Sequence, residues 1–327
     1  MKQLSQLEMA RKSEATRGTH YALISDVKRY ALHDGPGVRT SIFFKGCPLH
    51  CLWCDNPETQ EMHEELNYYV DECNFCGRCV EACPYGAISV RKNGQIHIER
   101  ELCRTDCYPN PPCVEACYMS ALQVVGKKIT LTSLMQIIEK DAEIYHRSGG
   151  GVTVTGGEPG LQSRFVTKLL KKCHEYGINT AIETCGYTEW ESLAEISEYV
   201  NFIFYDIKLY DSELHKAFTG KGNDLILQNS KLLSRKTARA GTKMIIRTPI
   251  VPGFTDSLTN LKAIANFVTS ELAIKNVELL PYHRLGKGKY KPLGRQYKLP
   301  EVRPPTAVKI THLRGIFERK GLKVECY

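Results

Sequence analysis

Short apolar runs alternate along most of the chain with segments whose apolar residues recur at helical spacing. The short runs are almost continuously apolar, as expected of strands buried on both faces of a sheet. In one helical segment Val166, Leu169 and Cys173 fall at i, i+3 and i+7. The pattern predicts strands at Ser41–Phe44, Val152–Thr155, Thr180–Glu183, Phe202–Asp206, Met244–Arg247 and Val277–Leu280.

Regular alternation of strands and helices predicts a parallel sheet with right-handed crossovers. Six strand–helix units are too few to close an eight-unit barrel at its usual geometry. We therefore expect an α/β protein built as a partial (β/α)6, TIM-like barrel, made from residues 21–57 and 126–327. Its open side leaves room for a large substrate.

Residues 58–125 break this alternation, because they are rich in Cys and Pro and contain no long periodic run. They lie between the first predicted strand and a helix expected near Thr132–His146, so we interpret them as an inserted module. Residues 1–20 are polar and charged, which predicts a flexible leader rather than a secretion signal. No apolar stretch is long enough to span a membrane, so we expect a cytoplasmic protein with no membrane partner.

The net charge of +8, from 44 basic and 36 acidic side chains, is a mild excess. No basic stripe with interleaved aromatic residues is visible, so a nucleic-acid partner is not expected. Much of the excess lies in a glycine-containing stretch that we interpret as a solvated loop. Its basic residues are Lys287, Lys289, Lys291, Arg295 and Lys298.

Polar or small residues follow the end of every predicted strand. In parallel α/β folds the carboxyl ends of the strands meet at one face, where active sites are built. Six separate loops are therefore expected to line one pocket. The residues concerned are Cys47, Gly156–Glu158, Glu183 and Thr184, Asp206 and Lys208, Arg247, and His283.

Eleven of the fourteen cysteines fall between positions 47 and 117. In a long chain without a signal peptide, such runs indicate metal ligands rather than disulfides. The first run, Cys47, Cys51 and Cys54, has the spacing C-x3-C-x2-C. Three thiolates leave one iron of a [4Fe–4S] cluster free for another ligand. A zinc site with His50 as fourth ligand is the alternative.

The second run has the bacterial ferredoxin spacing C-x2-C-x2-C-x3-C-P, and the third run ends in the same letters, VEAC. Together they predict a ferredoxin-like insert with two [4Fe–4S] clusters, in which the fourth cysteine of each run crosses to the other cluster. One cluster would take Cys73, Cys76, Cys79 and Cys117, and the other Cys103, Cys107, Cys113 and Cys83. Of the remaining cysteines, Cys173 is expected to be packing, while Cys185 fits a core position or the pocket equally well.

The first cysteine run resembles the signature of the radical S-adenosylmethionine superfamily, C-x3-C-x-aromatic-C, with Trp53 at the aromatic position. Three further segments extend the likeness: HDGPGVRT at His33–Thr40, GCPLHCLWCDNPE at Gly46–Glu58, and TGGEP at Thr155–Pro159. In this order they resemble the activating enzymes of glycyl radical enzymes, over roughly residues 24–325.

The resemblance implies three [4Fe–4S] clusters, S-adenosylmethionine, and a monovalent cation near Asp206 that Glu183 and Thr184 would help to bind. Asp34–Gly37 matches the family segment near the incoming glycine loop, although a plain Pro–Gly turn fits almost as well. Catalytic roles are implied for Cys47, Cys51, Cys54 and Lys208. Cofactor contacts are implied for Trp53, Asp55, Gly156, Gly157, Glu158, Asp206, Lys208, Arg247 and His283.

The function implied is reductive cleavage of S-adenosylmethionine to a 5′-deoxyadenosyl radical that takes hydrogen from a glycine of a large partner enzyme. A flavodoxin- or ferredoxin-type donor would supply electrons. One alternative is a radical enzyme that acts on a small molecule or another peptide. The other, a plain ferredoxin-like electron carrier, would need neither the C-x3-C-x2-C run nor the TGGEP segment. The sequence does not specify which glycyl radical enzyme is activated.

Overall fold

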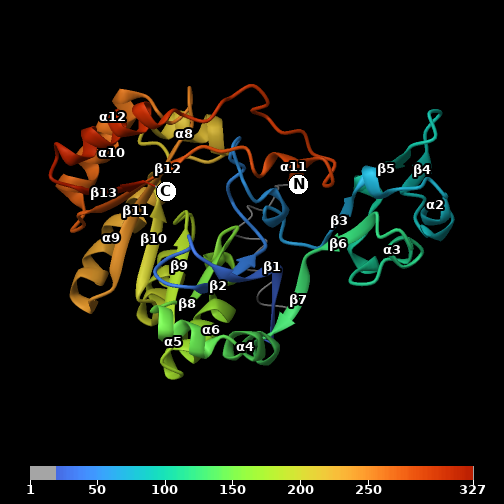
Figure 1. Cartoon of the computed structure of the whole chain (residues 1–327), viewed down its shortest axis with the longest axis horizontal. Coiled ribbons are helices and arrows are strands. Elements are labelled where there is room, and N and C mark those ends of the chain that lie inside the picture. Colours follow the sequence, from blue (N-terminus) through green and yellow to red (C-terminus); the bar gives the residue numbers. More distant parts are fainter. Residues whose placement is uncertain (1–19, 327) are drawn as a thin grey trace, which may run out of the picture.

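The computed structural model describes residues 20–326, which form one large sheet with a small module to one side (Figure 1). The leader predicted at residues 1–20 lies, except for residue 20, outside the described part. Within that part the large sheet has nine strands. They are β1 Tyr21–Ala31, β2 Arg39–Phe44, β7 Lys127–Thr130, β8 Gly151–Gly156, β9 Asn179–Thr184, β10 Phe202–Asp206, β11 Lys243–Ile250, β12 Asn276–Pro281 and β13 Lys323–Cys326.

The strand order is β13-β12-β11-β10-β9-β8-β2-β1-β7. All neighbours from β2 to β13 pair in parallel, whereas β1 pairs antiparallel with both β2 and β7. The six predicted strands are therefore confirmed, as is the parallel sheet. Three strands were not predicted: β1, β7 and β13. Because β13 and β7 are edge strands, the sheet of the described residues is open rather than closed.

Helices cover the outer face of the sheet (Figure 1). The predicted helical stripe is confirmed, since Val166, Leu169 and Cys173 are fully buried in the main core. The helix expected near Thr132–His146 is divided in two at Asp141, which is buried and bonded to Arg29. The helices are α4 Leu131–Glu139, α5 Ala142–Ser148, α6 Ser163–Glu175, α7 Trp190–Ile196, α8 Ser212–Thr219, α9 Asp224–Ala240, α10 Leu258–Glu271, α11 Lys287–Tyr290 and α12 Ala307–Glu318. No helix among the described residues combines the length and the apolar character needed to cross a membrane.

The module between β2 and β7 has its own small core, centred on Leu66, Ile88 and Leu122. It joins the rest of the chain through an antiparallel strand pair that carries the chain out and back. Its strands and helices are β3 Glu65–Tyr68, β6 Leu122–Val125, β4 Ile88–Val90, β5 Ile96–Ile98, α2 Arg78–Ala82 and α3 Pro112–Glu115. Short 3-10 helices occur at Pro57–Thr59, Val70–Glu72, Arg100–Leu102 and Thr105–Cys107 here, and at Pro159–Gln162 and Ser197–Tyr199 in the main unit.

The basic stretch near α11 packs against the base of this module. Arg295 Nη2 lies 2.5 Å from Glu65 Oε1, and Lys289 Nζ lies 2.9 Å from Glu58 Oε1. The prediction of a solvated loop is therefore wrong for Arg295, which is largely covered at the base of the module, whereas Lys289 is 42% exposed in spite of its ion pair. Lys291 does remain 70% exposed.

Candidate active site

The inner face of the large sheet is polar near the carboxyl ends of its strands, beyond a small apolar cluster of Ala181, Phe204 and Ile245, whereas the outer face is apolar. Side chains alternate along each strand, so Val154, Ile182 and Ile203 are fully buried toward the helices. Their neighbours Thr155 and Glu183 bond to one another on the opposite face, at 2.6 Å. The alternation therefore places hydrogen-bonding groups inside the curve of the sheet, near the carboxyl ends of its strands.

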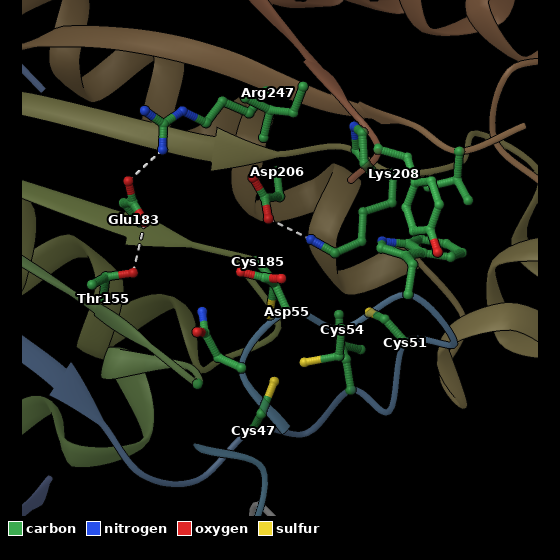
Figure 2. A pocket seen from close by; sticks show the side chains of 18 of the residues that line it. Cys47, Cys51, Cys54, Asp55, Thr155, Glu183, Cys185, Asp206, Lys208 and Arg247 are labelled. Atoms are coloured by element: carbon green, nitrogen blue, oxygen red, sulfur yellow. Dashed lines mark hydrogen bonds and ion pairs between the residues drawn. The ribbon is translucent and has the colours of Figure 1, made fainter. Parts of the chain in front are cut away.

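A pocket of about 280 Å³ lies at those carboxyl ends (Figure 2). Every catalytic or cofactor residue expected from the sequence lines it except Glu158. The structure thus brings together loops from six strands, as the pattern predicted. The expected residues that line it are Cys47, Cys51, Trp53, Cys54, Asp55, Gly156, Gly157, Asp206, Lys208, Arg247 and His283.

Backbone hydrogen bonds fix the loop that carries the three signature cysteines. The Cys47 amide donates to Gln60 O at 2.8 Å, and the His50 amide donates to Thr219 O at 2.7 Å. At the far end of the loop, the Tyr290 hydroxyl donates to Cys54 O at 2.8 Å. These hydrogen bonds hold the loop at both of its ends.

Gly156 and Gly157 are required by close packing of β8 against this loop. A Cβ at Gly157 would collide with the Gly46 carbonyl, and one at Gly156 would collide with the backbone of Phe44. Gly156 also has φ of 108°, which side chains rarely tolerate. Both glycines still line the pocket, although the Gly157 amide already donates to Phe44 O at 2.9 Å.

Glu158 is fully buried behind the pocket wall. Its carboxylate accepts from the Thr184 hydroxyl at 2.8 Å, from the Cys185 amide at 2.8 Å and from the Gly160 amide at 2.9 Å. Burial raises its pKa, although these donors oppose that rise. The carboxylate ties the end of β9 to the end of β8, and any contact of this segment with a ligand would come from Gly156 and Gly157.

The three signature thiols do not form a single-ion site. Among the described residues, no three His, Cys, Asp or Glu side chains are placed to share one metal ion. His50, the fourth ligand of the zinc alternative, is instead 3.9 Å from Glu61. Burial raises the pKa of Cys51 and that of Cys54, the latter to about 12. Metal binding must therefore displace protons from these two thiols.

Three thiols around one cavity suit a cluster larger than a single ion. Three cysteines fit the demand of a four-iron cluster that keeps one iron for an outside ligand. However, a fourth thiol, that of Cys185, lines the same pocket. The Cys185 thiol is hydrogen-bonded to Cys47, and this hydrogen bond together with burial raises the pKa of Cys185. The sequence left Cys185 undecided, and the structure places it in the pocket.

A buried cation lies beside the thiols. Lys208 is 9% exposed and forms an ion pair with Asp206 (Figure 2). Burial opposes its charge, but Asp206, Cys51 and Cys185 outweigh burial and raise its pKa. Lys208 therefore stays protonated and offers a positive charge to an anionic group in the pocket.

Arg247 reaches the pocket wall but directs its guanidinium elsewhere. Its Nε donates to Glu278 Oε2 at 2.6 Å, and it also pairs with Glu183 (Figure 2). The guanidinium stacks 3.8 Å from the centre of the Phe204 ring. Glu183 and Glu278 neutralise this charge, so the geometry favours a structural role, and the predicted cofactor contact remains a prediction.

The remaining predicted residues lie at the pocket rim. His283 is half exposed, and its Nδ1 is 3.6 Å from Asp55 Oδ1. Trp53 packs on the aromatic cluster of Tyr282 and Tyr290. These side chains can contact a ligand that enters from solvent.

Arg39 was not recognised from the sequence as a site residue. It is fully buried and donates to Thr153 Oγ1 at 2.7 Å, to Val152 O at 2.7 Å and to Pro36 O at 3.1 Å. These bonds hold the Asp34–Gly37 loop over the inner face of the sheet, where Gly35 and Pro36 line a second cavity of about 230 Å³. An arginine two residues after a Pro–Gly turn, at the start of an apolar strand, was the signal that could have identified this anchor.

The module gathers its eight cysteines around two cavities. One is lined by Cys73, Cys76, Cys79 and Cys117, and the other by Cys83, Cys103, Cys107 and Cys113. This is the crossed grouping expected from the two runs. A tyrosine stacks on an arginine at each cavity, Tyr118 on Arg78 at 4.7 Å and Tyr85 on Arg104 at 5.3 Å. The two halves of the module are therefore built alike.

Comparison with known proteins identifies iron–sulfur relatives of the chain. Residues 33–223 match a family model described as a 4Fe-4S single cluster domain. The indoleacetate decarboxylase activating enzyme of Tractidigestivibacter scatoligenes is 40% identical, over 92% of this chain and 96% of its own length. The isethionate sulfite-lyase activating enzyme of Oleidesulfovibrio alaskensis is 42% identical, over 85% of this chain and 88% of its own.

A solved domain of a pyruvate-formate lyase-activating enzyme from Bacteroides vulgatus is 29% identical. It aligns with a TM-score of 0.45, over 55% of this chain and 99% of that domain. The two curated relatives match nearly the whole chain, and the iron–sulfur family model covers more than half of it. The chain therefore belongs to the glycyl radical enzyme activating enzymes of the radical S-adenosylmethionine family.

Proposed function

We propose that this chain activates a glycyl radical enzyme by using S-adenosylmethionine and a [4Fe–4S] cluster bound by Cys47, Cys51 and Cys54. Cys47, Cys51 and Cys54 would hold the cluster, which when bound would supply the electron for cleavage of S-adenosylmethionine to the 5′-deoxyadenosyl radical that abstracts a hydrogen atom from a glycine of the partner. The observation that carries the proposal is the single pocket in which three thiols lie beside the Asp206–Lys208 pair.

The chain's own residues bind, orient and exclude water. Lys208 would supply a positive charge for a carboxylate, and Gly156 and Gly157, which line the pocket without side chains, would let a ligand approach the backbone closely. Trp53, Asp55 and His283 at the rim are placed to contact the adenosine side of the ligand. The buried cluster of Tyr282, Tyr290 and Tyr297 beneath the rim limits entry of water from that side.

The partner's glycine loop would enter beside Asp34–Gly37. Arg39 anchors that segment, and the open cavity next to it extends to Arg247. The partner enzyme itself is not specified by these residues. The two curated relatives are named for a decarboxylase and for a sulfite-lyase, so the partner belongs to a class broader than either.

We extend the proposal to the architecture and to the remaining cofactors. Strands β2 and β8 to β12 would form a partial (β/α)6 barrel, and residues 58–125 a ferredoxin-like insert. The two cysteine-lined cavities support two further [4Fe–4S] clusters, which would relay electrons from a flavodoxin- or ferredoxin-type donor. The monovalent cation stays a prediction, because Glu183 pairs with Arg247 and Thr184 bonds to Glu158.

The test compares wild type with Cys54→Ala after anaerobic reconstitution. Wild type should hold about twelve irons, from three four-iron clusters, and form 5′-deoxyadenosine when reduced. The variant should retain about eight irons and form none. Product from the variant, or a reproducible count near four in wild type, contradicts the assignment of the site or of the insert.

A second measurement separates activation from other radical chemistry. The enzyme encoded beside this chain in the genome is mixed with it, and electron paramagnetic resonance is recorded. A glycine-centred radical on the partner supports activation. Turnover of a small molecule or peptide without that radical favours the alternative.

A further inference from the structure

The two cysteine-lined cavities of the insert differ in how their tyrosines are bonded. The lining tyrosines are Tyr68 and Tyr118 in one, and Tyr85 and Tyr108 in the other. The Tyr118 hydroxyl accepts from Asn74 at 2.5 Å, and the Tyr85 hydroxyl donates to Asp106 at 2.9 Å. The Tyr68 hydroxyl is buried and has no hydrogen-bond partner among the described residues.

A buried hydroxyl without a partner costs about 1–3 kcal/mol, so such groups call for an explanation. Tyr68 lines the cavity of Cys73, Cys76, Cys79 and Cys117. The sulfur of Cys73 lies next to its hydroxyl. The hydroxyl therefore sits among thiols, with its proton free to be donated.

The backbone around Tyr68 fixes where the ring lies. Tyr68 pairs with Leu122 across β3 and β6, and its amide donates to Pro292 O at 2.9 Å. The acceptor of this second hydrogen bond, Pro292, belongs to the main unit of the chain. Both neighbours therefore hold the backbone of Tyr68 at the wall of the cavity that its side chain lines.

We propose that Tyr68 donates a hydrogen bond to a sulfur of the cluster held by Cys73, Cys76, Cys79 and Cys117, and thereby raises the reduction potential of that cluster. The inference rests on the insert clusters of the proposed function. Reduction adds one negative charge, which is spread over the sulfurs. A donor stabilises the reduced form more than the oxidised form, so removing the donor lowers the potential.

The test is Tyr68→Phe in the full-length chain, with Cys47, Cys51 and Cys54 replaced by Ala so that only insert clusters contribute. A redox titration followed by electron paramagnetic resonance measures the potentials. We expect the one-electron reduction equilibrium of one cluster to fall about three- to tenfold, which is about 28–59 mV at 59 mV per tenfold. The other cluster should not change.

Tyr69→Phe is the matched control. Its hydroxyl accepts from Asn67 at 3.3 Å and lies outside the cavity, so its removal should leave both potentials unchanged. Electron–nuclear double resonance of the unsubstituted Tyr68 protein gives an independent readout. Exchange into D2O should remove a strong proton coupling at one reduced cluster, and Tyr68→Phe should lack that coupling.

The outcomes separate this inference from the proposed function. Equal potentials in Tyr68→Phe and Tyr69→Phe overturn the inference while the clusters stand. If the Tyr68→Phe variant does not assemble its cluster, the test is the D2O-exchangeable proton coupling in the protein that retains Tyr68. Absence of that coupling overturns the inference. An insert that binds no iron even with Tyr68 present contradicts the cluster assignment itself.

Discussion

At the residue scale, Cys185 raises the sharpest question about the pocket. Four thiols line it, yet the proposed chemistry needs one iron without a thiolate. Cys185 follows directly on β9 rather than lying in the signature loop, and its amide donates to Glu158. We therefore expect Cys185 to lie beside the proposed iron ligand Cys47 without binding iron itself.

The prediction is that Cys185→Ala keeps about twelve irons and still forms 5′-deoxyadenosine, because the three signature thiols suffice. Cys173→Ala is the matched control, since it truncates an equally buried thiol that packs in the helical core. Iron content and product are measured for both. A loss of about four irons in Cys185→Ala alone identifies Cys185 as a fourth ligand and closes the open iron.

The ion-pair partners of Arg247 could not be predicted from the sequence. Arg247 and Glu278 are direct partners in the register of β11 and β12. That pairing depends on strand register, so no local spacing could show that the arginine is neutralised inside the sheet. The cysteine runs were predictable for the opposite reason, because all ligands of the signature loop lie within eight residues of each other.

At the element scale, the strands recovered from the sequence are those buried on both faces. Strand β1 was missed because only its first half is buried, while residues from Asp26 onward are largely exposed and charged. Strand β13 is short and lies at the edge. The single helix expected near Thr132–His146 is broken at Asp141 by a long-range bond to Arg29, at 2.8 Å, which periodicity does not encode.

The contact between β8 and the cysteine loop gives an element-scale prediction. Gly157→Ala places a Cβ against the Gly46 carbonyl, so the loop must shift and the thiols lose their alignment. Iron should fall from about twelve to about eight, with the insert unaffected. Gly288→Ala is the control, because a Cβ there meets nothing within 4 Å. Twelve irons in Gly157→Ala show that the close approach is not required.

At the scale of the whole molecule, the crossed grouping of the insert cysteines was predictable from spacing, but the attachment of the insert was not. Arg100 Nη2 donates to Pro292 O at 2.7 Å, and the Tyr68 amide donates to the same oxygen. These partners are far apart in the sequence. The loop that contains Pro292 thus clamps the insert. In the sequence, the basic stretch around this loop had the pattern of ordinary solvated surface.

Arg295 is the charge at the centre of this clamp. Its Nη2 contacts Glu65, whose other oxygen is 2.9 Å from the fully buried Lys45. Hydrogen bonds to charged groups contribute about 1.5–3 kcal/mol, and about 1.4 kcal/mol corresponds to tenfold in an equilibrium. Removing Arg295 should therefore open the base of the insert about tenfold more often, while Lys45 keeps Glu65 paired.

The prediction is that Arg295→Ala speeds amide hydrogen exchange in residues 57–68 about tenfold, with iron content unchanged. Lys291→Ala is the control, because its pair with Asp71 spans 3.8 Å between side chains that are 70% and 90% exposed. Such surface pairs contribute little. Equal exchange in both variants contradicts the clamp. If the clamp holds, the insert keeps a fixed position relative to the large sheet, as the proposed electron relay would require.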